Sequence, residues 1–137
     1  MIKLIAGPKG GGKTKRLIAL ANEKVAGTDG KIVFIDDDKR HIFDLHHQIR
    51  FVDTQDFPLE NYRELVGFIH GILSQDNDIV EIYIDGISNV VRNISNDDLL
   101  KLKNRLDAIV NSHGVKFIMT LNCEPAELPG ELQAVIA

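Results

Sequence analysis

The feature that most constrains the fold is the glycine-rich octet GPKGGGKT, residues 7–14, which lies between two apolar runs of different period. The run before it, residues 2–6, is short and bounded by glycine, as expected of a strand buried on both faces. After the octet, apolar residues recur at helical spacing as far as Gly27, where a helix would end. A strand that passes through glycines into a helix is typical of α/β proteins. The helical apolar positions are Leu17, Ile18, Ala21 and Val25.

The rest of the chain repeats this alternation of strand and helix. Helices are expected from Lys13, from Pro58 in a first turn, and after Ser95, which forms a capping box with Asp98. Strands joined by helices of this length form a parallel sheet with helices on both faces. The sequence therefore predicts an α/β fold, a three-layer αβα sandwich with a mostly parallel sheet of about five strands. The expected strands are residues 2–6, 31–35, 49–53, 79–85 and 115–121.

Composition limits the class of protein. The 137 residues fit one domain, 1–137, and the hydrophobic and charged fractions, 44% and 26%, are those of an ordinary soluble protein. A net charge of −4 does not indicate nucleic acid or an anionic membrane as a partner. Cys123 is the only cysteine, which excludes an intrachain disulfide and a cysteine-rich zinc site. No apolar run has the length of a membrane span, so we expect a cytoplasmic protein.

The octet matches the pattern G-x-x-x-x-G-K-[ST] and predicts a phosphate-binding loop. Glycines let successive backbone N–H groups converge on a polyphosphate, and the following helix N-terminus adds its positive dipole. Lys13 would reach the β- and γ-phosphates, and the Thr14 hydroxyl would ligate Mg²⁺. In the alternative interpretation, the glycines only link a strand to a helix. The candidate nucleotide-binding residues are Lys9, Gly10, Gly11, Gly12, Lys13, Thr14 and Lys15.

Acidic residues follow two of the predicted strands. Asp85 ends an apolar strand and is the candidate Mg²⁺ carboxylate, although a carboxylate there can also cap a turn. The triplet Asp36, Asp37 and Asp38 follows another strand and offers a base for an attacking water, or else a solvated turn. Of the three we favour Asp37, so that the candidate catalytic residues are Asp37 and Lys13.

Thr120 and Asn122 lie at the tip of the last predicted strand. A neutral side chain there can contact a γ-phosphate or hold the attacking water. In the alternative interpretation, its hydrogen bonds are made within the protein and only complete the end of the strand. The octet, the acidic triplet, Asp85 and Asn122 all follow strands, and the carboxyl ends of parallel strands share one edge. We therefore expect them to converge there.

The octet, the strand ending in Asp85 and the polar tip at Asn122 together resemble the P-loop NTPase superfamily, and within it the RecA-like ATPase branch. The resemblance spans nearly the whole chain and implies ATP and Mg²⁺ as cofactors. No N-K-x-D guanine signature is present, which favours ATP over GTP. Many hydrolytic members of the superfamily carry a glutamate after the Mg²⁺ aspartate, whereas this chain has Gly86.

A narrower resemblance concerns the first residues. GPKGGGKTKRLI is similar to the opening of type II thymidine kinases, G-P-M-x-S-G-K-[ST]-x-x-L-I, with Lys9 in place of the methionine. Those enzymes also carry the glutamate that Gly86 replaces and a cysteine-rich zinc lasso, which a chain with Cys123 alone cannot form.

Three functions follow from these observations. The leading hypothesis is a Mg²⁺-dependent ATPase that needs a protein partner or a second copy for full activity, because no base or arginine finger is evident; Arg92 and Arg105 are conceivable arginine donors. A second is a nucleotide-dependent binding module without significant hydrolysis. A third is a small-molecule or nucleoside kinase, which needs an acceptor pocket and a lid.

Overall fold

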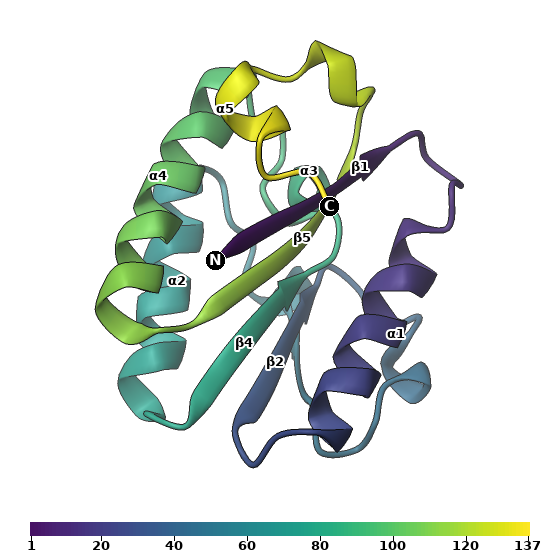
Figure 1. Ribbon diagram of the computed structural model, residues 1–137, viewed down its shortest axis with the longest axis vertical. Coiled ribbons are helices and arrows are strands. Elements are labelled where there is room, and N and C mark those ends of the chain that lie inside the picture. The colour runs from purple at the N-terminus through teal and green to yellow at the C-terminus, as the bar shows by residue number, and fades with distance from the viewer.

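A five-stranded, all-parallel sheet forms the centre of the molecule in the computed structural model, which describes residues 1–137 (Figure 1). The spatial order of the strands is β1-β5-β4-β2-β3, and every neighbouring pair is parallel. The predicted α/β class and the parallel five-stranded sheet are thereby confirmed. The strands are β1 (Ile2–Gly7), β2 (Lys31–Asp36), β3 (Arg50–Asp53), β4 (Ile79–Ile84) and β5 (Lys116–Asn122).

Helices cover both faces of the sheet and complete three layers (Figure 1). On one face α1 (Lys13–Ala26) packs over the side chains of alternate strand residues such as Phe34 and Tyr83. On the other, α2 (Tyr62–Gln75) and α4 (Asn96–His113) cover the intervening residues. None of the helices combines the length and apolar character needed to cross a membrane. The short helices are η1 (Ile42–Asp44), η2 (Thr54–Asp56), α3 (Ile87–Val90), η3 (Pro125–Glu127) and α5 (Gly130–Gln133).

The helix ends follow their capping residues. Ser95 caps α4 as predicted, since its Oγ accepts a hydrogen bond from the Asp98 amide at 3.1 Å. The prediction that Pro58 lies in the first turn of the next helix is wrong. Asn61 caps α2 instead, because its Oδ1 accepts from the Glu64 amide at 3.0 Å, and the helix begins at Tyr62.

The carboxyl edge of the sheet collects the polar residues that follow the strands. Gly7, the first residue of the octet, pairs in register with Asn122 at the ends of β1 and β5. The amide of Asp85 donates to the carbonyl of Ile35 at 2.9 Å, which holds the end of β4 beside the end of β2. The expected convergence of the octet, the acidic triplet, Asp85 and Asn122 on this edge is therefore confirmed.

Candidate nucleotide-binding site

The loop between β1 and α1 has the backbone conformation that its glycines permit. Gly10 and Gly12 have φ angles of 85° and 82°, in the left-handed region that other residues rarely adopt. An added Cβ at either position would meet nothing within 4 Å, so conformation and not crowding requires glycine there. Gly12 also precedes the first turn of α1, whose N–H groups have no partner within the helix. The loop thus presents free backbone donors at a helix N-terminus.

The lysines of the octet region differ in their contacts. Lys13 folds back over the loop, and its Nζ donates to the carbonyl of Pro8 at 2.6 Å. Lys9 and Lys15 are exposed, and neither side chain contacts the rest of the chain through a hydrogen bond or an ion pair. Of these three lysines, only Lys13 is therefore held against the loop by a hydrogen bond.

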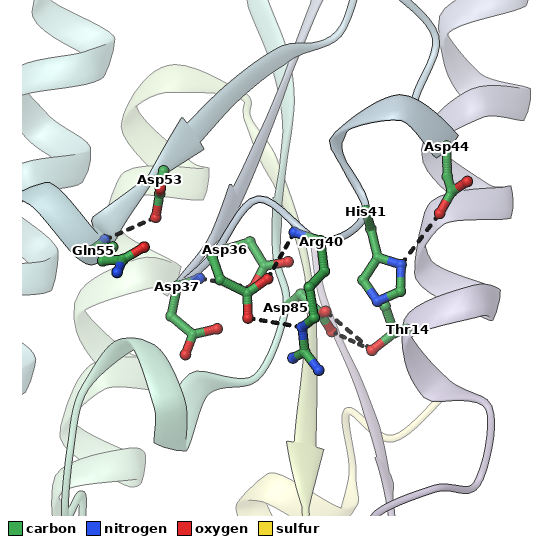
Figure 2. A network of polar contacts seen from close by, with 10 residues as sticks. Thr14, Asp36, Asp37, Arg40, His41, Asp44, Asp53, Gln55 and Asp85 are labelled. Atoms are coloured by element: carbon green, nitrogen blue, oxygen red, sulfur yellow. Dashed lines mark hydrogen bonds and ion pairs between the residues drawn. The ribbon is translucent and has the colours of Figure 1, made fainter.

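Thr14 and Asp85 form the contact that joins the octet to the opposite side of the edge (Figure 2). The Thr14 hydroxyl lies 3.2 Å from Oδ1 and 3.0 Å from Oδ2 of Asp85. Asp85 is 8% exposed and also accepts a hydrogen bond from the Thr120 hydroxyl at 2.8 Å. The Thr120 oxygen in turn accepts from the Gly86 amide at 2.7 Å. Thr120 is thus engaged in orienting Asp85, and its hydroxyl does not extend toward a ligand.

The donor set of this contact fits Mg²⁺. No group of three or more histidine, cysteine, aspartate or glutamate side chains is arranged to hold a metal ion by itself. Mg²⁺ commonly takes only one or two protein oxygens and completes its shell with phosphates and waters. The hydroxyl of Thr14 and the carboxylate of Asp85 are oxygen ligands of that kind. The site therefore fits a magnesium ion only together with a phosphate ligand.

Asp36 is the member of the acidic triplet that faces Asp85. It is in phase with Ile32 and Phe34, whose side chains pack on the α1 side of the sheet, because alternate strand residues share a face. Its side chain is buried, and Oδ1 accepts from the Asp37 amide at 2.7 Å. Burial, together with the Asp37 side chain and the charge of Asp85, raises the pKa of Asp36 to about 8. Asp36 is therefore largely uncharged at neutral pH.

Asp37, the residue favoured by sequence reasoning, is half-buried beyond the end of β2 and lines a separate cavity. Its part as a base stays a prediction. What sequence reasoning missed is that Asp36 lies close to Asp85, although the strand alternation that places Asp36 on the α1 side was available in the sequence.

Gly86 has a structural reason for not being glutamate. Its φ angle is 70°, in the left-handed region, and an ideal Cβ there would lie 2.9 Å from Nδ2 of Asn89. The Asn89 side chain therefore covers the space that a side chain at position 86 would need. The positive φ disfavours any side chain at this position, and Asn89 would have to rotate to admit one.

The segment after the triplet makes its own turn. Asp38 accepts hydrogen bonds from the backbone amide and the Nε atom of Arg40, both at 2.9 Å. Nδ1 of His41 lies 3.2 Å from Oδ2 of Asp44 (Figure 2). No hydrogen bond or ion pair joins Arg40 or His41 to Thr14. Of the conceivable arginine donors, Arg92 lies in the loop after α3, whereas Arg105 lies on α4.

No protein-family model matches this chain, and no curated protein sequence matches it either. The geometry of the site is consequently the basis for assigning its function. It combines free N–H donors, a lysine at the loop and a hydroxyl–carboxylate pair, which together can hold a polyphosphate and a magnesium ion.

Proposed function

We propose that this protein is a RecA-like member of the P-loop NTPase superfamily that binds ATP with Mg²⁺ and hydrolyses it. The observation that carries the proposal is the contact of Thr14 with Asp85, with oxygens 3.0 Å apart across 71 residues of sequence. Two Mg²⁺-type ligands brought together beside a glycine-rich loop and a helix N-terminus are what a Mg²⁺–polyphosphate complex requires.

Each part of the site has a role in the proposal. The amides of the loop would donate to the phosphates, and Lys13 would exchange the carbonyl of Pro8 for a phosphate oxygen. Thr14 and Asp85 would hold Mg²⁺, which when bound neutralises charge on the β- and γ-phosphates. Thr120 would keep the carboxylate of Asp85 oriented through its 2.8 Å hydrogen bond.

The isolated chain should hydrolyse ATP slowly. A general base must be ionised to accept a proton from water, and in the protein without Mg²⁺ or nucleotide, burial, the Asp37 side chain and the charge of Asp85 raise the pKa of Asp36 to about 8, which disfavours it as that base. Gly86 supplies no carboxylate, so Asp37 is the remaining candidate base. A protein partner or a second copy that contributes an arginine would then raise the rate by orders of magnitude.

A second candidate function is that of a nucleotide-dependent binding module. The observation that favours it is Gly86, whose positive φ disfavours a side chain, so that no carboxylate follows Asp85 to activate water. In that case ATP would set the conformation or the assembly of the protein without being consumed.

ATP binding is the first test. The affinity for a fluorescent ATP analogue in Mg²⁺ is measured for the wild type, Lys13→Ala and Lys101→Ala, the last removing an exposed lysine of α4. We expect Lys13→Ala to weaken binding by about tenfold or more, because a charge-assisted hydrogen bond is lost, and Lys101→Ala to bind normally. Equal affinity in all three proteins would overturn the nucleotide proposal.

Hydrolysis is the second test. Phosphate release is followed for the wild type, Asp85→Ala and Asp37→Ala over a range of protein concentrations. Activity per molecule that rises with concentration and is lost in Asp85→Ala supports an ATPase completed by a second copy. ATP binding with no release at any concentration would overturn hydrolysis by this protein.

A further inference from the structure

A polar cavity of about 750 Å³ lies at the same carboxyl edge, beyond the ends of β2 and β3. Its walls come from four places: Asp37 after β2, the helix η2, residues 58–60 before α2, and residues 88–93 after β4. Of its lining residues the nucleotide proposal uses only Asp37, and we call this space the edge cavity. Its volume is within the range of small-molecule sites.

The wall formed by residues 86–93 is held in place by contacts with β5 and with the segment before α2. The Gly86 amide donates to the hydroxyl oxygen of Thr120, and Val91 forms a β-bridge with Leu59, which lines the cavity. Between these anchored positions, polar side chains line the cavity. The buried anchors are Ile87, Val90 and Val91, which are 1%, 3% and 1% exposed, and the polar residues are Ser88, Asn89, Arg92 and Asn93. An anchored backbone thus carries these hydrogen-bonding side chains at the cavity wall.

These polar groups have no partners within the chain. No intramolecular hydrogen bond or ion pair engages the side chains of the cavity's amides, its serine or its arginine. Their donors and acceptors are consequently available to a ligand. The side chains concerned are those of Gln55, Ser88, Asn89, Arg92 and Asn93.

The edge cavity adjoins the proposed phosphate site. Asp37 lines the cavity and donates its amide hydrogen to Asp36, which faces Asp85. Asn89 lines the cavity too, and its Nδ2 lies against Gly86, the residue after Asp85. A ligand in the cavity would therefore lie next to the pair of carboxyl groups at the edge.

The lining selects the class of ligand. The charged lining residues are two carboxylates, Asp37 and Glu60, and one cation, Arg92, so the walls carry a net negative charge that disfavours an anionic ligand. No aromatic side chain lines the cavity, so a planar base has nothing to stack on. Carboxylates accept hydrogen bonds, and side-chain amides both donate and accept them. The hydroxyl groups of a polyol, which also donate and accept, can be bound by such a set.

We propose that the edge cavity binds an uncharged polyhydroxylated small molecule, such as a monosaccharide or cyclitol, and that this molecule accepts the γ-phosphoryl group of ATP. This proposal rests on the proposed ATP site. The oxygen of an acceptor hydroxyl forms a bond to the γ-phosphorus while the bond to the β,γ-bridging oxygen breaks, and ADP leaves with that electron pair. The hydroxyl proton passes to the carboxylate of Asp37, which lines the cavity.

Binding is tested first without nucleotide. Amide signals of the ¹⁵N-labelled protein are followed by NMR while glucose, ribose, glycerol, myo-inositol or thymidine is added at millimolar concentration. At least one of the four polyols should shift the amides of Gln55, Asn89 and Arg92 and leave those of the octet in place. Arg92→Ala should weaken that binding by about tenfold, since a charged donor is lost, whereas Arg105→Ala, an exposed arginine of α4, should not.

Transfer is tested next with Mg-ATP. The polyol that binds should appear by mass spectrometry as its monophosphate, with one ADP for each, and Asp37→Asn should abolish transfer while keeping the NMR shifts. Shifts by thymidine alone, by no probe, or binding without transfer would each overturn the proposal. Failure of the proposed ATP site would be recognised separately. In that case the wild type would not bind the ATP analogue, while the polyol would still shift the amide signals of the cavity residues.

Discussion

Nδ2 of Asn89 lies 2.9 Å from the position that a Cβ at Gly86 would occupy. This contact, with the positive φ of Gly86, makes the residue after Asp85 unable to carry a side chain without strain. A left-handed conformation costs a non-glycine residue roughly 1–2 kcal/mol. Gly86→Glu should therefore destabilise the protein by at least about that amount, and should not raise phosphate release as a well-placed base would.

Urea unfolding followed by circular dichroism measures this change. Asn89→Ala removes the amide that occupies the space, so Gly86→Ala should cost less stability in the Asn89→Ala background than in the wild type. Equal costs in the two backgrounds would mean that the contact between residues 86 and 89 contributes nothing. The difference between the two costs isolates the contact from the backbone strain.

A second prediction concerns Thr120, whose hydroxyl bridges the Gly86 amide and Asp85. Thr120→Val keeps the shape and removes the hydroxyl, leaving a buried N–H without its partner. We expect a loss of about 1–3 kcal/mol in the free energy of unfolding, and weaker Mg-ATP binding because Asp85 is less well oriented. Thr120→Ser, which retains the hydroxyl, should recover most of both. If Thr120→Val matches the wild type, the bridge is unimportant.

Local patterns predicted most element boundaries. The ends of α4 followed from Ser95, which caps it, and from Gly114, whose φ of 70° ends it. The start of α2 was misjudged because Pro58 suits a first turn, yet Leu59 is held in a bridge to Val91 and Asn61 supplies the cap. Pro58 and Asn61 were both possible signals for the start of the helix. The bridge between Leu59 and Val91, which no local pattern shows, decided between them.

The candidate site, too, could be predicted from the sequence only in part. The meeting of Thr14 with Asp85 was predictable, since both follow strands of one parallel sheet. That Asp36 and not Asp37 faces Asp85 follows from strand alternation, but only if β2 continues regularly to its last residue. The edge cavity depends on how the loops after three strands are placed against one another, which a single sequence does not encode in any local pattern.

A third prediction concerns pH. The pKa of Asp36 is raised from its ordinary value of 3.8 to about 8 by burial, by the side chain of Asp37 and by the charges of Asp85 and Asp38. A carboxyl group with a raised pKa binds its proton more tightly in the folded protein than in the unfolded chain. Its stabilising contribution is therefore complete below about pH 4 and is lost as the pH rises toward 8, by up to about 1.4 kcal/mol per pH unit.

Asp36→Asn removes this titration and keeps a side chain of the same shape. In nucleotide-free protein with a chelator present, the variant should be more stable than the wild type at pH 8, and this advantage should shrink as the pH falls toward 5. Urea unfolding at several pH values measures the difference. A difference that does not change with pH would mean that Asp36 titrates normally in the folded state.

The last prediction concerns Mg²⁺ and nucleotide together. Because no three acidic or histidine side chains are grouped to hold a metal, the phosphates must supply the remaining ligands beside Thr14 and Asp85. Mg²⁺ alone should leave the thermal unfolding midpoint nearly unchanged, whereas Mg-ATP at about 100 times its dissociation constant should stabilise the fold by about 2.7 kcal/mol. Asp85→Asn should lose most of the additional stabilisation that Mg²⁺ gives to ATP, while ATP with a chelator should affect both proteins equally. A midpoint raised by Mg²⁺ alone, and abolished in Asp85→Asn, would instead show a metal site that forms without nucleotide.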